Sequence, residues 1–408
     1  MLELVDITPI NPMKQEEDVA KESPVDSVTT LGVLSWLMLC SLGTLQLQPV
    51  IGGALVDHLG ISLPHIGILF GTELVATAIG CCVAALSMSR LDRRLLCVAA
   101  VLLLLTASIA CAWITAFIWL AVARFAAGLA GGMIQAVVYA TAALRTNKNR
   151  TFAMINIALM VGGGLTIGLA PTMAAAGGVA MIFGLFAVMA LMVLPLLRVI
   201  PRGAADIPDL PLAAAAANPA EFGKHAIPLL LLFALLFAGH TALWIYQERI
   251  GDALGLSHDY IGAILGGSTL LGMLGAAIAG VVGRRLNQWM AQLIAFTGAI
   301  LASLLIVYGQ SGLVYASGVA LLMTVRFFGV TYMFVLSTDL DPSGRLTGLA
   351  NTAIFVGAGV GPFAAAAVVG HGNVQAVGLL SAGIYVICIA VARYVTTGAR
   401  ALKIAPAQ

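Results

Sequence analysis

Twelve long apolar segments dominate this sequence. An α-helix rises about 1.5 Å per residue, so about 20 apolar residues cross the ~30 Å hydrocarbon core of a bilayer. Segments of this kind cover residues 29–53, 63–88, 94–115, 117–143, 151–175, 178–198, 227–248, 260–282, 287–308, 313–337, 347–370 and 374–393. Only 9% of the residues are charged, which is too few to cover a water-facing surface. The sequence therefore predicts an all-α membrane protein with twelve transmembrane helices.

The basic residues predict the orientation of these helices. If the N-terminus is cytoplasmic, 17 of the 20 Lys and Arg residues fall in cytoplasmic segments and only Arg249 falls on the other side. Arg124 and Arg326 then lie inside the membrane. Because cytoplasmic loops carry the excess of Lys and Arg, this asymmetry predicts that both termini are cytoplasmic. We expect a multi-pass protein of the bacterial inner membrane.

The loops suggest a division into two bundles of six helices. The expected units are a cytoplasmic N-terminal tail (1–28), an N-terminal bundle (29–198), a cytoplasmic linker rich in Pro and Ala (199–226), a C-terminal bundle (227–393) and a C-terminal tail (394–408). The first 27 residues are acidic and lack the basic start and apolar stretch of a signal peptide.

An internal repeat supports the division. Leu59-Gly60-Ile61-Ser62 recurs as Leu254-Gly255-Leu256-Ser257, at an offset of 195 residues. The same offset relates Arg150 to Arg345 and Asn156 to Asn351 in a second region. Two regions that agree on one offset indicate two copies of a six-helix unit, and an even number of helices gives the copies parallel topology.

With these features the chain resembles the major facilitator superfamily over nearly its whole length. Arg124-Phe-Ala-Ala-Gly128-Leu-Ala-Gly131-Gly132 is similar to the helix-4 motif of that family, and 89–94 looks like a degenerate form of its basic loop. Gly164, Gly168 and Pro171 match its helix-5 Gly-Pro motif loosely, whereas the closer match lies in helix 11, at Gly357, Gly361 and Pro362. The resemblance implies a central cavity, open alternately to each side, and no ATP site.

Two charges in the N-terminal half are candidates for proton coupling. Counted along their helices, Glu73 lies roughly 15 Å and Arg124 roughly 10 Å from the outer face, so the two are at similar depth. Burial disfavours the ionised form of a carboxyl group, and a nearby Arg favours that form again. The affinity of Glu73 for a proton would therefore change whenever a conformational change moved Arg124. The alternative is a static ion pair that locks two helices. His240, in the other half, is a third candidate.

Arg326 is the main candidate for substrate binding. An unpaired guanidinium near the midplane offers a fork for a carboxylate, and no acidic residue of the C-terminal half lies at its depth. A structural bond to carbonyl groups or to a distant Glu is the alternative. Further candidates for the cavity lining are polar or aromatic: Gln46, Gln48, Gln135, Tyr139, Trp244, Tyr332, Asn156 and Asn351. His240 and Trp244 are equally consistent with packing and an interfacial belt, and the two Asn with helix contacts.

The remaining candidates concern gating. They are Arg90, Asp92, Arg93, Arg94, Gly164, Gly168, Pro171, Gly361 and Pro362. The arginines are also consistent with simple anchoring at the cytoplasmic face.

The sequence as a whole predicts a secondary transporter for small organic molecules, proton-coupled and acting as a monomer. Proton-linked uptake of an organic, possibly aromatic, carboxylate is the alternative to efflux. A membrane sensor or intramembrane enzyme is a further alternative, but no soluble domain or cluster of catalytic residues supports it. The six Cys show no metal-ligand spacing, and no Gly-rich loop ends in Gly-Lys-Ser/Thr. We therefore expect no cofactor, metal or nucleic-acid partner.

Overall fold

The computed structural model describes residues 24–88, 90–203, 225–341, 345–370 and 373–404, and these are helical, without a strand. The helices are η1 (Pro24–Asp26), α2 (Val28–Gln46), α3 (Gln48–Leu59), α4 (Leu63–Ser87), α5 (Arg93–Trp113), α6 (Phe117–Ala142), α7 (Lys148–Val193), η2 (Leu194–Val199), α9 (Ala226–Trp244), α10 (Gln247–Ala253), α11 (His258–Val282), η4 (Gly283–Arg285), α12 (Gln288–Tyr308), α13 (Gly312–Leu340), α14 (Arg345–Val369) and α15 (Val374–Ile404).

Twelve membrane crossings result. Eleven helical spans in the described residues are long and apolar enough to cross a membrane, and one of them, 150–199, is long enough for two crossings. Within it α7 breaks at Gly177 and Gly178, where Gly178 has φ +63° and ψ −158°. That backbone conformation favours Gly, and it lets the chain turn back between the fifth and sixth crossings. The predicted twelve-helix architecture is therefore confirmed.

Two of the expected helices are interrupted near one end. The segment expected as one helix over 29–53 consists of α2 and α3, which meet at Leu47, and α3 has Pro49 in its first turn. Pro lacks an N–H group, so it begins a helix more readily than it continues one. The segment expected over 227–248 likewise divides into α9 and α10. At the other end of the chain, α15 continues to Ile404, past the expected boundary at residue 393.

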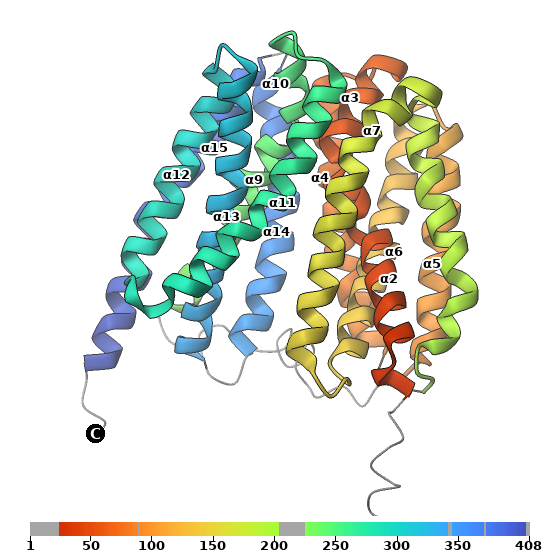
Figure 1. Cartoon of the computed structure of the whole chain (residues 1–408), viewed down its shortest axis with the longest axis horizontal. Helices are drawn as coiled ribbons and strands as arrows, with labels where there is room; N and C mark the ends of the chain where they lie inside the picture. The colour runs from red at the N-terminus through yellow and green to blue at the C-terminus, as the bar shows by residue number, and fades with distance from the viewer. Residues whose placement is uncertain (1–23, 89, 204–224, 342–344, 371–372, 405–408) are drawn as a thin grey trace, which may run out of the picture.

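Figure 1 shows that α2 begins and α15 ends at the same end of the bundle, here called the lower end, while α3 and α10 meet at the opposite, upper end. The N-terminal half comprises the helices from α2 to η2, and the C-terminal half those from α9 to α15. Between the halves α4 packs against α14 and α7 packs against α11.

The packing between the halves repeats the 195-residue offset. A Cβ atom on Gly67 would lie 2.6 Å from the carbonyl oxygen of Pro362 and 2.8 Å from Ala366. A Cβ atom on Gly262, which is 67 plus 195, would lie 2.6 Å from Pro171 and 3.3 Å from the carbonyl oxygen of Ile167. Subtracting 195 from 366 and 362 gives 171 and 167. The two copies of the unit therefore contact each other through equivalent surfaces, with Gly where the helices approach most closely.

The contacts that hold the halves together include several at the upper end. The Tyr246 hydroxyl donates to the Leu63 carbonyl oxygen at 2.8 Å, joining the C-terminal half to the start of α4. The Thr172 hydroxyl donates to Asp259 at 3.4 Å, joining α7 to α11. These hydrogen bonds join the two halves at the upper end.

Candidate functional site

Glu73 and Arg124 form an ion pair inside the N-terminal half. Glu73 lies on α4 and Arg124 on α6, and their side chains are 1% and 0% exposed. Arg124 Nη2 contacts Glu73 Oε1, and Arg124 Nε donates to Glu73 Oε2 at 3.3 Å. The Thr44 hydroxyl, from α2, donates to Glu73 Oε1 at 3.2 Å. Three helices of one half thus surround the Glu73 carboxyl group, and the structure brings together the two residues that the sequence placed at similar depth.

Close backbone packing makes the pair possible. A Cβ atom on Gly128 would lie 2.3 Å from the Glu73 carbonyl oxygen, and one on Gly132 would lie 2.0 Å from the Thr77 carbonyl oxygen. The glycines of the helix-4 motif therefore let α6 lie directly against α4. On its other side the Arg124 guanidinium lies 5.3 Å from the centre of the Phe183 ring, which belongs to the second crossing of α7.

Arg326 has a different environment in the C-terminal half. Its guanidinium lies 4.3 Å from the centre of the Phe327 ring and 5.8 Å from the centre of the Phe237 ring, which belongs to α9. Its Nε atom is buried without a hydrogen-bond partner, and no carboxylate of the described residues pairs with it. The side chain as a whole is half-buried.

His240 and Trp244 lie together on α9. Their rings stack at 5.8 Å between centres and 23° between planes. His240 is 3% exposed, the charge of Arg326 acts on it, and its Nδ1 has no hydrogen-bond partner in the described part of the chain. The structure therefore places His240, which the sequence assigned to proton coupling, near Arg326 and in contact with Trp244, both of which it assigned to substrate binding.

The polar candidates of the N-terminal half are also inside the bundle. Gln46 lies over Gly163 of α7, and Gln48 is buried with an unpaired Nε2 atom. Gln135 accepts a hydrogen bond from the Cys81 thiol at 3.3 Å, and Tyr139 packs against Phe152. No ligand contact tests these four, so their role stays a prediction.

Three other candidates lie apart from Arg326 and its aromatic neighbours. The Tyr332 hydroxyl donates to the Gly283 carbonyl oxygen at 2.8 Å, which ties α13 to the end of α11. Asn156 is exposed and donates to the Phe152 carbonyl of its own helix at 2.8 Å, and Asn351 is exposed on α14. The hydrogen bond of Asn156 is thus within its own helix, and the roles of both Asn residues stay predictions.

The basic loop binds the end of its own half. Asp92 caps α5 by accepting from the backbone N–H groups of Arg94 and Leu95, and it also accepts from the Gly203 N–H at 3.0 Å. These backbone donors, Gly203 first, lower the pKa of the Asp92 carboxyl. Arg94 Nε donates to the Ile200 carbonyl oxygen at 2.8 Å, and the Arg93 N–H donates to the Gly203 carbonyl oxygen at 3.1 Å.

These contacts connect α5 to the chain that follows the sixth crossing, within the N-terminal half. Arg90 is exposed beside them. A gating role for the loop stays a prediction.

The Gly-Pro candidates lie between the halves. A Cβ atom added to Gly164 would lie 3.0 Å from the carbonyl oxygen of Gly266, and Pro171 packs against Gly262. Gly168 lies beside Gly266, and Pro362 lies against Gly67, whereas Gly361 packs on α9 at the Ala238 carbonyl. Apart from Gly361, these residues border the contact surfaces between the halves, and a gating role for them stays a prediction.

Sequence reasoning missed an ion-pair network at the upper end. Arg249 of α10 donates to both oxygens of Asp57 of α3, at 2.7 and 2.8 Å, and it also pairs with the adjacent Glu248. His258 Nδ1 lies 2.9 Å from Glu248. We call Asp57, Glu248, Arg249 and His258 the upper latch, because Asp57 belongs to one half and the other three to the other. The available signal was the isolation of Arg249 on its side of the membrane.

Asp57, Glu248 and His258 also bring ligand atoms within 4.8 Å of one another, a spacing that a metal ion could use. Both carboxylates already accept hydrogen bonds from Arg249, whose positive charge balances them. The donor set therefore fits an ion-pair network better than a metal ion.

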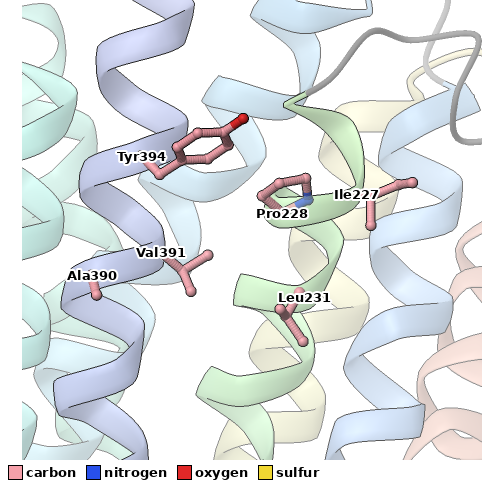
Figure 2. Close-up of a pocket in the computed structure, with 6 residues that line it drawn as sticks. All are labelled: Ile227, Pro228, Leu231, Ala390, Val391 and Tyr394. Carbon is pink, nitrogen blue, oxygen red and sulfur yellow. The ribbon is translucent and has the colours of Figure 1, made fainter.

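A shallow apolar groove lies elsewhere, between α9 and α15 (Figure 2). It has a volume of about 390 Å³ and is lined by Ile227, Pro228, Leu231, Ala390, Val391 and Tyr394. It contains no charged group and does not include Arg326.

Comparisons with known proteins agree with this geometry. A family model described as the Major Facilitator Superfamily matches residues 33–341. A mutant of the nucleoside transporter NupG superposes with a TM-score of 0.75 at 14% identity, over 90% of this chain and 98% of that one. A D-xylose-proton symporter superposes with a TM-score of 0.69 at 14% identity, over 90% and 97%. The human organic anion transporter MFSD10 superposes with a TM-score of 0.61 at 18% identity, over 91% and 100%.

No curated protein matches the chain in sequence. The solved structures share its fold at identities too low to carry their substrates over. The family model, in contrast, covers three quarters of the chain, and the repeat and the twelve crossings agree with it. This chain belongs to the Major Facilitator Superfamily and is a multi-pass membrane transporter.

Proposed function

We propose that this protein is a proton-coupled secondary transporter of small organic molecules. The observation that carries the proposal is the buried Glu73–Arg124 pair, which lies inside one half rather than at a water-facing surface. A charged group at bilayer depth costs about 2.5–3.5 kcal/mol on insertion scales, so two of them in one place indicate a use. We assign the lower end to the cytoplasm of a bacterium, because the basic loops lie there.

In this proposal the pair works as a proton switch. When Glu73 is ionised, Arg124 and Thr44 hold it and the three helices α2, α4 and α6 are tied together. When Glu73 takes a proton, the attraction to Arg124 falls and the helices are free to shift. The two halves then rock about the Gly-lined surfaces between α4 and α14 and between α7 and α11, and the single chain supplies the complete path.

The neighbouring structures support transport but do not agree on a substrate: their titles name a nucleoside transporter, a D-xylose-proton symporter and an organic anion transporter. Arg326 favours an organic anion for this chain. A charge without a carboxylate partner is suited to bind one from the ligand, which supports uptake or efflux of an organic acid.

Proteoliposomes that enclose a pH-sensitive dye test the coupling. Organic acids, nucleosides and sugars would be added in turn under an imposed pH gradient. We expect at least one compound to evoke a proton flux in the wild-type protein and none to do so with Glu73→Gln, because an amide cannot take up the proton. Exchange of the same compound without a gradient should persist in Glu73→Gln and serves as the control for folding. A normal proton flux in Glu73→Gln would overturn the proposal.

A further inference from the structure

We propose that Arg326, His240, Phe237 and Phe327 form a binding site for an aromatic or similarly flat carboxylate, which we call the anion site. The inference deepens the proposed function, since it names the substrate class of the transporter. It depends on side-chain contacts between α9 and α13 that the sequence does not reveal.

The first step is the charge. Arg326 lies about 21 Å along α13 from Gly312, near the middle of the membrane, and the described residues offer it no carboxylate. Its Nε is buried and makes no hydrogen bond. Arg124, the other intramembrane arginine, has Glu73 as its partner. An arginine that stays unpaired at this depth is costly, and a carboxylate brought by a ligand would supply the missing partner.

The second step is the shape of the surroundings. Phe327 and Phe237 lie 4.3 and 5.8 Å from the Arg326 guanidinium, measured to the ring centres. A ring contacts the face of a guanidinium, whereas a carboxylate binds its N–H edge, so the two kinds of partner do not compete. The two rings thus hold the Arg326 side chain in place and leave its N–H edge for a ligand. The apolar faces of the rings suit a flat organic group.

The third step is a second polar group close by. His240 lies three residues after Phe237 on α9, so the two share a face of that helix. Its ring is fixed by stacking on Trp244, and its Nδ1 has no partner among the described residues. A buried nitrogen in this position can hydrogen-bond a substituent or the carboxylate itself. Tyr385 also lies within electrostatic reach of Arg326, and its hydroxyl is buried without a hydrogen-bond partner among the described residues. One cation, two further polar side chains and several rings match a monoanion better than a sugar, which requires many hydroxyl partners.

Binding to the purified protein tests the anion site independently of transport. The probes are benzoate, phenylacetate and indole-3-acetate, each paired with its uncharged amide, measured by equilibrium dialysis of the radiolabelled compounds. We expect at least one acid to bind at least tenfold more tightly than its amide. Arg326→Lys keeps the charge and loses the fork, and should weaken that acid at least tenfold, which corresponds to about 1.4 kcal/mol.

Two further variants complete the design. Arg326→Met should abolish the preference for the acid while the protein still folds, because the change removes a charge from the membrane interior. Arg285→Lys, at an exposed arginine outside the site, should bind like the wild type. Equal binding of acid and amide in all three pairs, or wild-type affinity in Arg326→Lys, would overturn the inference.

The two proposals fail in distinguishable ways. Arg326-dependent binding of an acid without any proton flux leaves the anion site in place and refutes proton coupling. Proton flux with an uncharged compound, and no preference for the acids, supports proton coupling and refutes the anion site.

Discussion

The two intramembrane arginines lie on equivalent helices of the repeat but have opposite environments. Arg124 on α6 has a carboxyl partner, Glu73, in its own half, whereas Arg326 on α13 has aromatic rings and no carboxylate among the described residues. The positions do not correspond: 326 minus 195 is Gly131, and 73 plus 195 is Ser268. The repeat therefore preserved the packing surfaces between the halves, while the charged groups diverged.

This difference suggests that the two halves of the protein have different functions. A charge that is balanced inside one half contributes to the electrostatics of that half alone, and it can respond to a proton. A charge without a partner in the protein can bind an anionic ligand that enters the transporter. In our account the N-terminal half handles the proton and the C-terminal half handles the organic ligand.

The largest expected effect on stability comes from removing one partner of the Glu73–Arg124 ion pair. Glu73→Ala leaves Arg124 buried without its carboxylate, and we expect a loss of about 3–5 kcal/mol of stability, seen as a much lower Tm in detergent. The double variant Glu73→Ala, Arg124→Met removes the orphaned charge and should recover most of the loss. A double variant no more stable than Glu73→Ala alone would show that the pair is not what holds α4 to α6.

Removing the charge of Arg326 should have little effect on stability. Arg326→Met removes no ion pair, so we expect its Tm to equal or exceed that of the wild type. A drop comparable to that of Glu73→Ala would mean that Arg326 has a structural partner, and the contrast between the two arginines would no longer hold.

An effect smaller than that of Glu73→Ala is expected at the third arginine of interest, Arg249 of the upper latch. Arg249 is 11% and Asp57 40% exposed, so solvent screens their attraction and the pair contributes about 1 kcal/mol or less. Asp57→Asn and Arg249→Gln should each speed hydrogen exchange in 48–59 and 247–253, because the contact between α3 and α10 becomes less populated. In a double-mutant cycle the two changes should not be additive. Additive effects would show that the two residues do not form a latch in the membrane.

Much of the architecture was predictable from the sequence because the membrane imposes it. Helices of about 20 apolar residues, the excess of basic loops on one side and the 195-residue offset all leave local or periodic signals. Glu73 and Arg124 were matched by depth alone, since the rise of a helix converts residue counts into position. The breaks at Leu47 and after Trp244 escaped, because apolar patterns run through them.

The side-chain contacts within the sites were harder to predict from the sequence. Asp57 and Arg249 are 192 residues apart, and only the tertiary fold brings them together. The ring of Phe237 could not be assigned to Arg326, because many apolar side chains of α9 are equivalent in sequence and only the packing of α9 on α13 selects one. Nothing in the sequence indicated that the Tyr332 hydroxyl bonds to the end of α11, because the two bonded residues are 49 apart.

The division of labour between Glu73 and Arg326 is tested most directly by transport of one radiolabelled acid in two variants, side by side in proteoliposomes. The account predicts that Glu73→Gln loses accumulation driven by a pH gradient but keeps exchange of the acid without a gradient. Arg326→Lys is predicted to lose both, because the acid no longer binds. If the two variants lose the same activities to the same extent, the proton and the ligand do not have separate sites, and the account is contradicted.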